Sequence, residues 1–199
     1  SCCTEAWRNS SHEENGMGKL IYSNMMTLDG FMAGTDGSLD WASIDEELHR
    51  FVNQEVRDWD AFLYGRRMYE VMEAYWPTAQ ADPSISAVEL EFAQIWNAMP
   101  KLVFSKTLAQ VAGNCRLKRE IVPAEMLELK QRSPQGLGLG GANLAAAFMQ
   151  LDLVDEYQIY IHPVRLGEGQ PAFQAGTQKA ELRLEQARAF GSGVVFLRY

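Results

Sequence analysis

The sequence predicts an α/β fold with a mainly parallel central sheet, helices on both faces and an antiparallel edge formed by the C-terminal strands. Three observations support this fold class. Short apolar runs typical of buried strands alternate with segments of helical periodicity. Several of these runs end in glycine or polar turn residues directly before a helix. The last two strand-like segments are separated by the turn Gly191–Gly193, as in an antiparallel pair.

The predicted helices carry apolar residues at helical spacing. They cover residues 43–59, 67–75, 85–98, 124–131 and 142–150. Ser43 and Glu46 form the pattern of a capping box at the start of the first helix. Pro77 ends the second helix. Pro123 suits the first position of the fourth helix, where its missing N–H is not needed.

The predicted strands are apolar or alternating segments bounded by turn residues. They cover residues 19–27, 31–33, 61–64, 101–104, 115–118, 136–139, 156–162, 181–187 and 193–199. No internal repeat or linker interrupts them, so residues 17–199 are predicted to form a single domain. Residues 1–16 are polar and aperiodic, and we expect them to be a non-native or disordered extension.

Composition argues against several classes of protein. The formal net charge is −8 and the cations are scattered, which is unfavourable for nucleic-acid binding. No apolar run is long enough to cross a membrane. The three cysteines form no CxxC motif and the three histidines are dispersed, so neither a disulfide framework nor a metal site is expected. This cysteine usage fits a reducing compartment, and we expect a cytoplasmic protein.

A glycine-rich turn is the strongest local signal. The segment Gly136–Leu144 leads from a predicted strand through glycines directly into a helix. Glycines let a phosphate approach the backbone, and the free N–H groups and dipole of a helix N-terminus attract it. The same pattern also fits a tight turn in which glycine merely allows close packing. The segment is not a Rossmann fingerprint, because no acidic residue follows at the required distance.

Two other predicted strands end in cationic and hydroxyl side chains. Arg66 and Arg67 follow the strand at 61–64, and Ser105 and Lys106 follow the strand at 101–104. Open α/β sheets bind ligands at the carboxyl ends of their strands, so the three turns are expected to converge on one ligand. Arginine and lysine beside hydroxyl groups suit a dianionic 2′-phosphate, which favours NADPH over NADH. Each cation alone is more typical of a solvated helix end.

Seven short motifs occur in order along residues 17–199. They are Thr27–Gly30, Gly65–Glu70, Ser105–Leu108, Gly140–Leu144, Leu153–Glu156, His162–Gly169 and Gly191–Tyr199. In this order they resemble the dihydrofolate-reductase-like superfamily, and more closely the reductase domain of bifunctional riboflavin-biosynthesis proteins and its stand-alone relatives. The resemblance implies a three-layer fold, a homodimer, and NADPH-dependent hydride transfer to a pterin-like or pyrimidine-like heterocycle.

The resemblance also implies which residues bind the cofactor. They are Gly65, Arg66, Arg67, Ser105, Lys106, Gly140, Gly141, Ala142, Asn143 and Leu144. The first five match the turns around the adenosine phosphate, and the last five match the pyrophosphate turn. In relatives the Gly–Gly bond of that turn is often cis, and we expect the same for Gly140–Gly141.

Hydride addition to a C=N bond also needs a proton donor. Asp29 is one candidate, because it ends the first strand near the expected nicotinamide position; alternatively, it forms an Asx-type turn before Gly30. Glu47 is a second candidate, on the first helix, where a solvated helix face is the alternative. Glu46 is expected to be occupied as the capping partner of Ser43.

Aromatic and cationic residues supply candidates for the substrate site. Trp41 and Tyr69 are expected to face the ligand, and His162 either lines the pocket or has a structural role. Arg165 is the best candidate for a phosphate carried by a riboflavin-pathway substrate. The sequence therefore predicts an NADPH-dependent reductase of a small heterocycle. The alternative from another class is an NADPH-binding module without turnover.

Overall fold

The computed structural model describes residues 17–199, and the expected extension at 1–16 lies outside these described residues. The helices are α1 (Glu46–Val56), α2 (Arg66–Tyr75), α3 (Ala87–Ala98), α4 (Pro123–Gln131) and α5 (Ala142–Gln150), with a short 3₁₀ turn at Ala79–Ala81. The strands are β1 (Leu20–Thr27), β2 (Phe31–Ala33), β3 (Ala61–Gly65), β4 (Lys101–Phe104), β5 (Cys115–Lys118), β6 (Leu137–Gly140), β7 (Glu156–His162), β8 (Gln170–Pro171), β9 (Gln186–Ala189) and β10 (Val195–Arg198).

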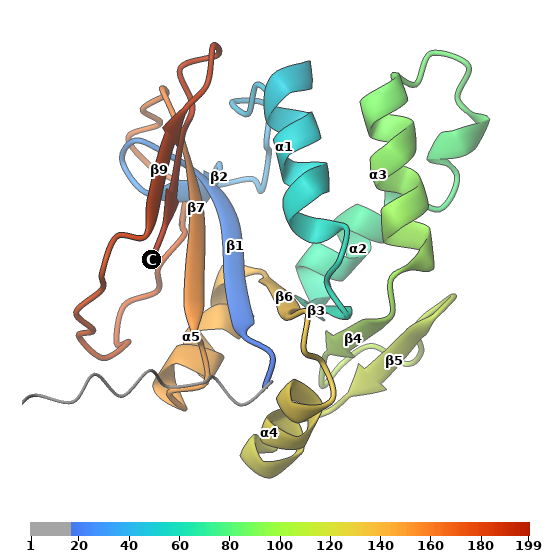
Figure 1. Ribbon diagram of the computed structural model, residues 1–199, viewed down its shortest axis with the longest axis vertical. Helices are drawn as coiled ribbons and strands as arrows, with labels where there is room; N and C mark the ends of the chain where they lie inside the picture. Colours follow the sequence, from blue (N-terminus) through green and yellow to red (C-terminus); the bar gives the residue numbers. More distant parts are fainter. Residues whose placement is uncertain (1–16) are drawn as a thin grey trace, which may run out of the picture.

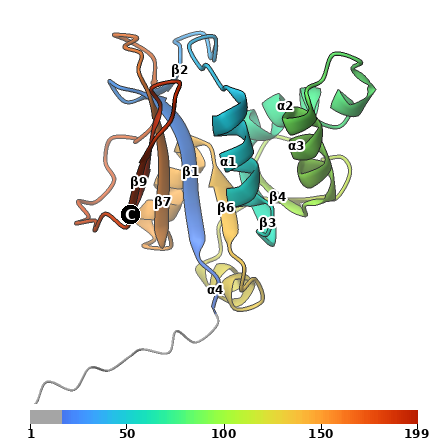
Figure 2. The same cartoon turned by 45° about the horizontal axis from the view of Figure 1, so that its top comes forward.

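The central sheet has the order β5-β4-β3-β6-β1-β7-β10-β9, and β2 pairs with β8 in a separate small sheet. From β5 across the sheet to β7, each pair of adjacent strands is parallel. Strand β10 is antiparallel to both of its neighbours, β7 and β9. Helices α1, α2 and α3 lie on one side of the sheet and α5 on the other (Figure 1 and Figure 2). The predicted α/β class, with its antiparallel C-terminal edge, is confirmed.

Alternation along the strands explains why both faces are covered. Tyr22 and Leu63 belong to the core cluster that includes Phe148 of α5. Their neighbours Ile21 and Phe62 belong to a second cluster, which α1, α2 and α3 help to form. Since successive side chains of a strand point to opposite faces, the two clusters are the two sides of one sheet. No helix within residues 17–199 is long and apolar enough to cross a membrane.

The start of α1 differs from the prediction. Its N-cap is Asp45, whose carboxylate accepts a hydrogen bond of 2.8 Å from the backbone N–H of Leu48. The predicted capping box with Ser43 is therefore wrong. Leu48 is fully buried, so the helix register places it against the sheet and leaves Asp45 three residues earlier as the cap. A complete capping box occurs instead in α3, between Ser86 and Glu89.

Gly138 of β6 gives a first testable prediction. A Cβ at this position would lie 2.2 and 2.3 Å from Cζ3 and Cε3 of Trp59. We expect Gly138→Ala to lower the free energy of unfolding by about 1–3 kcal/mol, because the ring has to move within a packed core. Urea unfolding followed by circular dichroism measures this. Trp59→Leu in the same background should recover part of the loss, and strictly additive effects would contradict the predicted clash.

Candidate functional site

The three turns predicted to bind phosphate meet at one edge of the sheet. Strands β4, β3 and β6 are adjacent, with Gly65 opposite Phe104 and Tyr64 opposite Gly140. A Cβ built on Gly65 would lie 3.5 Å from Cβ of Leu144, and one on Gly141 would lie 3.9 Å from the Gly65 nitrogen. The residues that follow the three strands are therefore close neighbours in space.

Two helices start at this edge without a side-chain cap. Gly65 is the N-cap of α2 and Gly141 that of α5, and neither helix has an acidic residue in its first turn. By contrast, α1 and α3 have caps from Asp45 and Ser86. The first N–H groups of α2 and α5 are thus without a carboxylate or hydroxyl at the point where an anionic ligand would bind.

The backbone of the glycine turn differs in one respect from the expectation. The Gly140–Gly141 peptide bond is trans, so the cis geometry implied by the resemblance is wrong. The chain turns through Gly141 itself, which has φ +98° and ψ +119°. This conformation is accessible to glycine and strained for any residue with a Cβ.

The first arginine of the pair connects two turns. Arg66 Nε donates to Glu70 Oε1 at 2.7 Å, and Arg66 Nη1 donates to Thr107 Oγ1 at 2.9 Å. Ser105 Oγ accepts hydrogen bonds from the backbone N–H groups of Thr107 and Leu108. These contacts shape the turns after β3 and β4. Thr107 is a site residue that the sequence analysis missed, although it lies in the quoted motif Ser105–Leu108.

The other two cations of these turns, Arg67 and Lys106, are available to bind a ligand. Arg67 and Lys106 are exposed, and neither makes a hydrogen bond or ion pair with another residue of the described part of the chain. Because Arg67 follows β3 and Lys106 follows β4, they flank the same turn region. They are the cations best placed to bind a phosphate group.

Asp29 connects the end of β1 to a distant loop. Its carboxylate accepts hydrogen bonds from Thr27 Oγ1 at 2.6 Å, the Gly167 N–H at 2.7 Å and the Leu166 N–H at 3.2 Å. The hydrogen bond from Thr27, together with those from the two backbone N–H groups, holds the pKa of Asp29 below its ordinary value. This geometry favours a structural role for Asp29, in which the carboxylate positions the loop, rather than a role as proton donor.

Replacing this carboxylate should loosen the loop. We expect Asp29→Asn to accelerate hydrogen exchange at the Leu166 and Gly167 amides, because the amide oxygen is a weaker acceptor and only one remains. Since the pKa of Asp29 is lowered on folding, the wild-type contact is complete above the ordinary pKa and is lost as the pH falls through the lowered value. Exchange of these two amides in wild type and Asp29→Asn, measured by mass spectrometry at pH 7, tests this, and unchanged protection in the variant would contradict the role.

Glu47 also has protein partners. It accepts hydrogen bonds from Arg188 Nη2 at 2.9 Å and from the Gly191 N–H at 3.2 Å. The Gly191 contact, followed by Arg188, lowers the pKa of Glu47. Glu47 therefore connects the start of α1 to the β9–β10 hairpin. As for Asp29, the contacts favour a structural carboxylate rather than the predicted proton donor.

The three predicted substrate residues have different environments. Tyr69 is buried in the core beside α3, and its hydroxyl accepts a hydrogen bond of 3.0 Å from the Ala112 N–H. Tyr69 is thus a core residue, contrary to the expectation that it faces a ligand. His162 and Trp41 lie together, with their ring centroids 5.2 Å apart in an edge-to-face arrangement.

His162 and Trp41 each present an unsatisfied polar atom. His162 is 1% exposed at the end of β7, opposite Thr27 in the register with β1. Its Nε2 and the Nε1 of Trp41 are buried and have no hydrogen-bond partner among the described residues. Leaving a buried polar group unpaired costs about 1–3 kcal/mol, so one such atom on each of two packed rings indicates a place for a polar ligand or water.

A cavity of about 390 Å³ lies between the starts of α1 and α3 and the end of α2, and neither His162 nor Trp41 is among its lining residues. Its lining consists of Ile44, Asp45, Glu46, His49, Tyr75, Trp76, Ser86, Val88 and Glu89. Aromatic rings and carboxylates therefore predominate, and neither lysine nor arginine contributes. No local sequence pattern reveals this cavity, because it combines three helices that have no shared motif.

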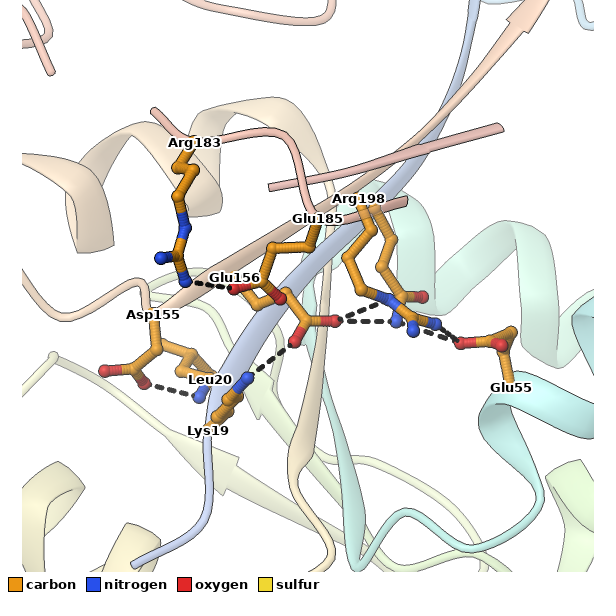
Figure 3. Close-up of polar contacts among 9 residues, drawn as sticks. Lys19, Leu20, Glu55, Asp155, Glu156, Arg183, Glu185 and Arg198 are labelled. Carbon is orange, nitrogen blue, oxygen red and sulfur yellow. Dashed lines mark hydrogen bonds and ion pairs between the residues drawn. The ribbon is translucent and has the colours of Figure 1, made fainter. Parts of the chain in front are cut away.

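A second cavity, of about 350 Å³, lies at the amino ends of β1, β6 and β7. There Glu156 pairs with Lys19 and Arg198 at 3.1 and 3.2 Å, and Arg198 also pairs with Glu55 (Figure 3). These two cations and two carboxylates neutralise one another. The network connects α1 with β7 and β10, and a structural role explains it fully.

Comparisons with known proteins found relatives that cover most of the chain. The model of the RibD C-terminal domain family matches residues 18–196. The protein YyaP of Bacillus subtilis is 34% identical over 184 residues, with 91% of this chain and 94% of YyaP covered. The protein YwjB of the same organism is 27% identical over 178 residues, covering 88% and 94% of the two chains.

Solved structures show the same fold. A putative riboflavin biosynthesis protein from Shewanella sp. PV-4 has a TM-score of 0.68 at 20% identity, covering 91% of this chain and 97% of that one. A deaminase/5-amino-6-(5-phosphoribosylamino)uracil reductase from Thermotoga maritima has a TM-score of 0.62 at 15% identity, with 92% of this chain and 56% of that one covered. The chain belongs to the RibD C-terminal domain family, with its dihydrofolate-reductase-like fold.

Proposed function

We propose that this protein is an NADPH-dependent oxidoreductase that reduces a small pterin-like or pyrimidine-like heterocycle. The observation that supports this most directly is the meeting of two helix N-termini without side-chain caps with two cations, Arg67 and Lys106, that have no ion-pair partner among residues 17–199, at the ends of β3, β4 and β6. Membership of a family whose solved relatives include named reductases supports the same reaction class.

Each part of the cofactor has a suitable partner. The N–H groups at the start of α5, together with the side-chain-free turn at Gly141, suit the pyrophosphate. Arg67 and Lys106, with the Ser105–Thr107 turn between them and Arg66, suit the 2′-phosphate. When bound, NADPH supplies the hydride. The protein's own residues orient it along the edge from β4 toward β1.

The cavity between α1, α2 and α3 favours an unphosphorylated substrate. Three of its lining residues are acidic, so a phosphate group would meet carboxylates and no cation there. A neutral or cationic heterocycle would instead lie against Tyr75 and Trp76. Arg165, exposed in the loop that Asp29 holds, is the alternative for a riboflavin-pathway substrate with a phosphate.

Two measurements test the function. Calorimetry with NADPH and NADH should give binding with a preference for NADPH, and oxidation of NADPH should follow when a suitable pterin, pyrimidine or quinoid heterocycle is added. Binding without oxidation for the whole panel would favour the alternative, an NADPH-binding module. No binding of either coenzyme would reject both.

We also expect a cytoplasmic homodimer. Sedimentation at two protein concentrations tests the oligomeric state.

A further inference from the structure

The end of β7 contains a titratable group that the cofactor site does not use. His162 is the register partner of Thr27, where β1 ends, and β1 is the direct neighbour of β6 and its glycine turn. Two interstrand spacings, about 10 Å in total, separate β6 from β7. A dinucleotide whose pyrophosphate lies at the β6 turn has one nucleotide half to extend across this distance.

The reaction needs a proton, and the expected donors have other contacts. Asp29 accepts three hydrogen bonds and Glu47 accepts two, and the pKa of each carboxyl group is lowered. Both are therefore carboxylates near neutral pH, without a proton to give. Among residues 17–199, His162 Nε2 is buried and has no hydrogen-bond partner, and the ring of His162 packs edge-to-face against Trp41, whose Nε1 likewise has none.

Resting on the proposed function, we infer that His162 is the proton donor of the reduction and that Trp41 orients the substrate beside it. Hydride adds to the carbon of the C=N bond, and the π electrons move to the nitrogen. That nitrogen forms a bond to the proton of His162 Nε2, which leaves a neutral imidazole. A solvent proton then restores the imidazolium, so one NADPH and one proton are consumed for each substrate reduced.

The surroundings of His162 determine its pH dependence. Burial lowers the pKa of His162, and no charged neighbour contributes to the shift. The charged residues on the neighbouring segments include Asp29 after β1, Asp40 and Asp45 on either side of Trp41, Glu47 on α1, Arg165 after β7 and Arg188 on β9. The pKa of His162 therefore lies below its ordinary value of about 6.5. A lowered pKa makes the imidazolium a stronger acid but reduces its population at neutral pH.

The first test observes the imidazole directly, without turnover. In residues 17–199 the histidines are His49 and His162, so the variants His49→Gln and His162→Gln assign their NMR signals. In the free protein, the signal lost in His162→Gln should titrate below about 6.5. Adding NADP⁺ together with a heterocycle from the panel, which cannot react, should shift the Nε2 resonance. An Nε2 resonance that no ligand of the panel moves would overturn the inference.

The second test is kinetic and uses two variants. Glutamine places an amide N–H near the position of Nε2 but cannot give up a proton, so His162→Gln should lower kcat about 100-fold or more. In wild type, kcat should rise as the pH falls through the lowered pKa of His162, and His162→Gln should lose this limb. Trp41→Phe keeps a ring against His162 but removes Nε1–H, so it should raise KM and retain the limb.

These outcomes separate the two proposals. If wild type oxidises NADPH and His162→Gln keeps both its kcat and its pH profile, the role of His162 is wrong and the reductase assignment stands. If NADPH binding by His162→Gln matches wild type while turnover is lost, the role is supported and a folding defect is excluded. If wild type binds no NADPH, the proposed function fails and the inference fails with it.

Discussion

Replacing Arg67 and Lys106 together by alanine is expected to weaken NADPH binding about 100-fold and to leave NADH binding nearly unchanged. Each side chain is exposed and has no hydrogen-bond or ion-pair partner among residues 17–199, so its removal breaks no polar contact within the described protein. A hydrogen bond to a charged group contributes about 1.5–3 kcal/mol, and two bonds at the lower limit correspond to about a 100-fold change in affinity. Calorimetry with both coenzymes measures the effect.

A matched control separates the local effect from net charge. The double variant Lys179→Ala/Arg183→Ala also removes two positive charges. These residues lie on the segment that precedes β9, the outermost strand of the sheet on the side away from β3 and β4. Within the described part of the chain, Lys179 and Arg183 pair with the exposed carboxylates of Glu181 and Glu185, two residues further along the sequence. We expect this control to change NADPH affinity less than threefold at physiological ionic strength, because screening reduces distant charge effects. Equal losses in both double variants would contradict a specific 2′-phosphate site.

Most of the main elements were predictable because each has a local signal. Strands Lys101–Phe104 and Glu156–His162 and helix Ala142–Gln150 have the predicted bounds. The small strand Gln170–Pro171 was not predictable, because it has no apolar pattern and depends on pairing with β2, more than a hundred residues earlier. Likewise, the predicted strand at 181–187 begins only at Gln186, where pairing with β10 becomes available.

The candidate site was predictable in position but not in the role of each residue. Glycines and cations after strands are visible in the sequence, and parallel pairing brings them together. The different roles of Arg66 and Arg67 depend on Thr107, which lies on a neighbouring turn. Similarly, whether Asp29 is an acid or an anchor depends on the Leu166 and Gly167 amides. Such assignments require contacts between distant segments, which no local pattern contains.

Gly141→Ala is expected to impair both the cofactor site and the fold. At φ +98° and ψ +119°, a residue with a Cβ carries backbone strain of about 1–3 kcal/mol. The new Cβ would also lie 3.6 Å from Cβ of Met68 and 3.9 Å from the Gly65 nitrogen. Relaxation of this strain would shift the start of α5, whose N–H groups are proposed to bind the pyrophosphate. We therefore expect NADPH affinity to fall at least tenfold.

The control for strain alone is Gly176→Ala. Gly176 has φ +86°, and a Cβ there would meet nothing within 4 Å. Both variants should lose comparable free energy of unfolding in urea, because both force an alanine into a conformation suited to glycine. Only Gly141→Ala should lose affinity for NADPH and, as a result, the rise in melting temperature that excess NADPH gives to wild type. If Gly141→Ala kept that rise in full, the turn after β6 would not bind the cofactor, and Arg67 and Lys106 would have to hold it without the helix N-terminus.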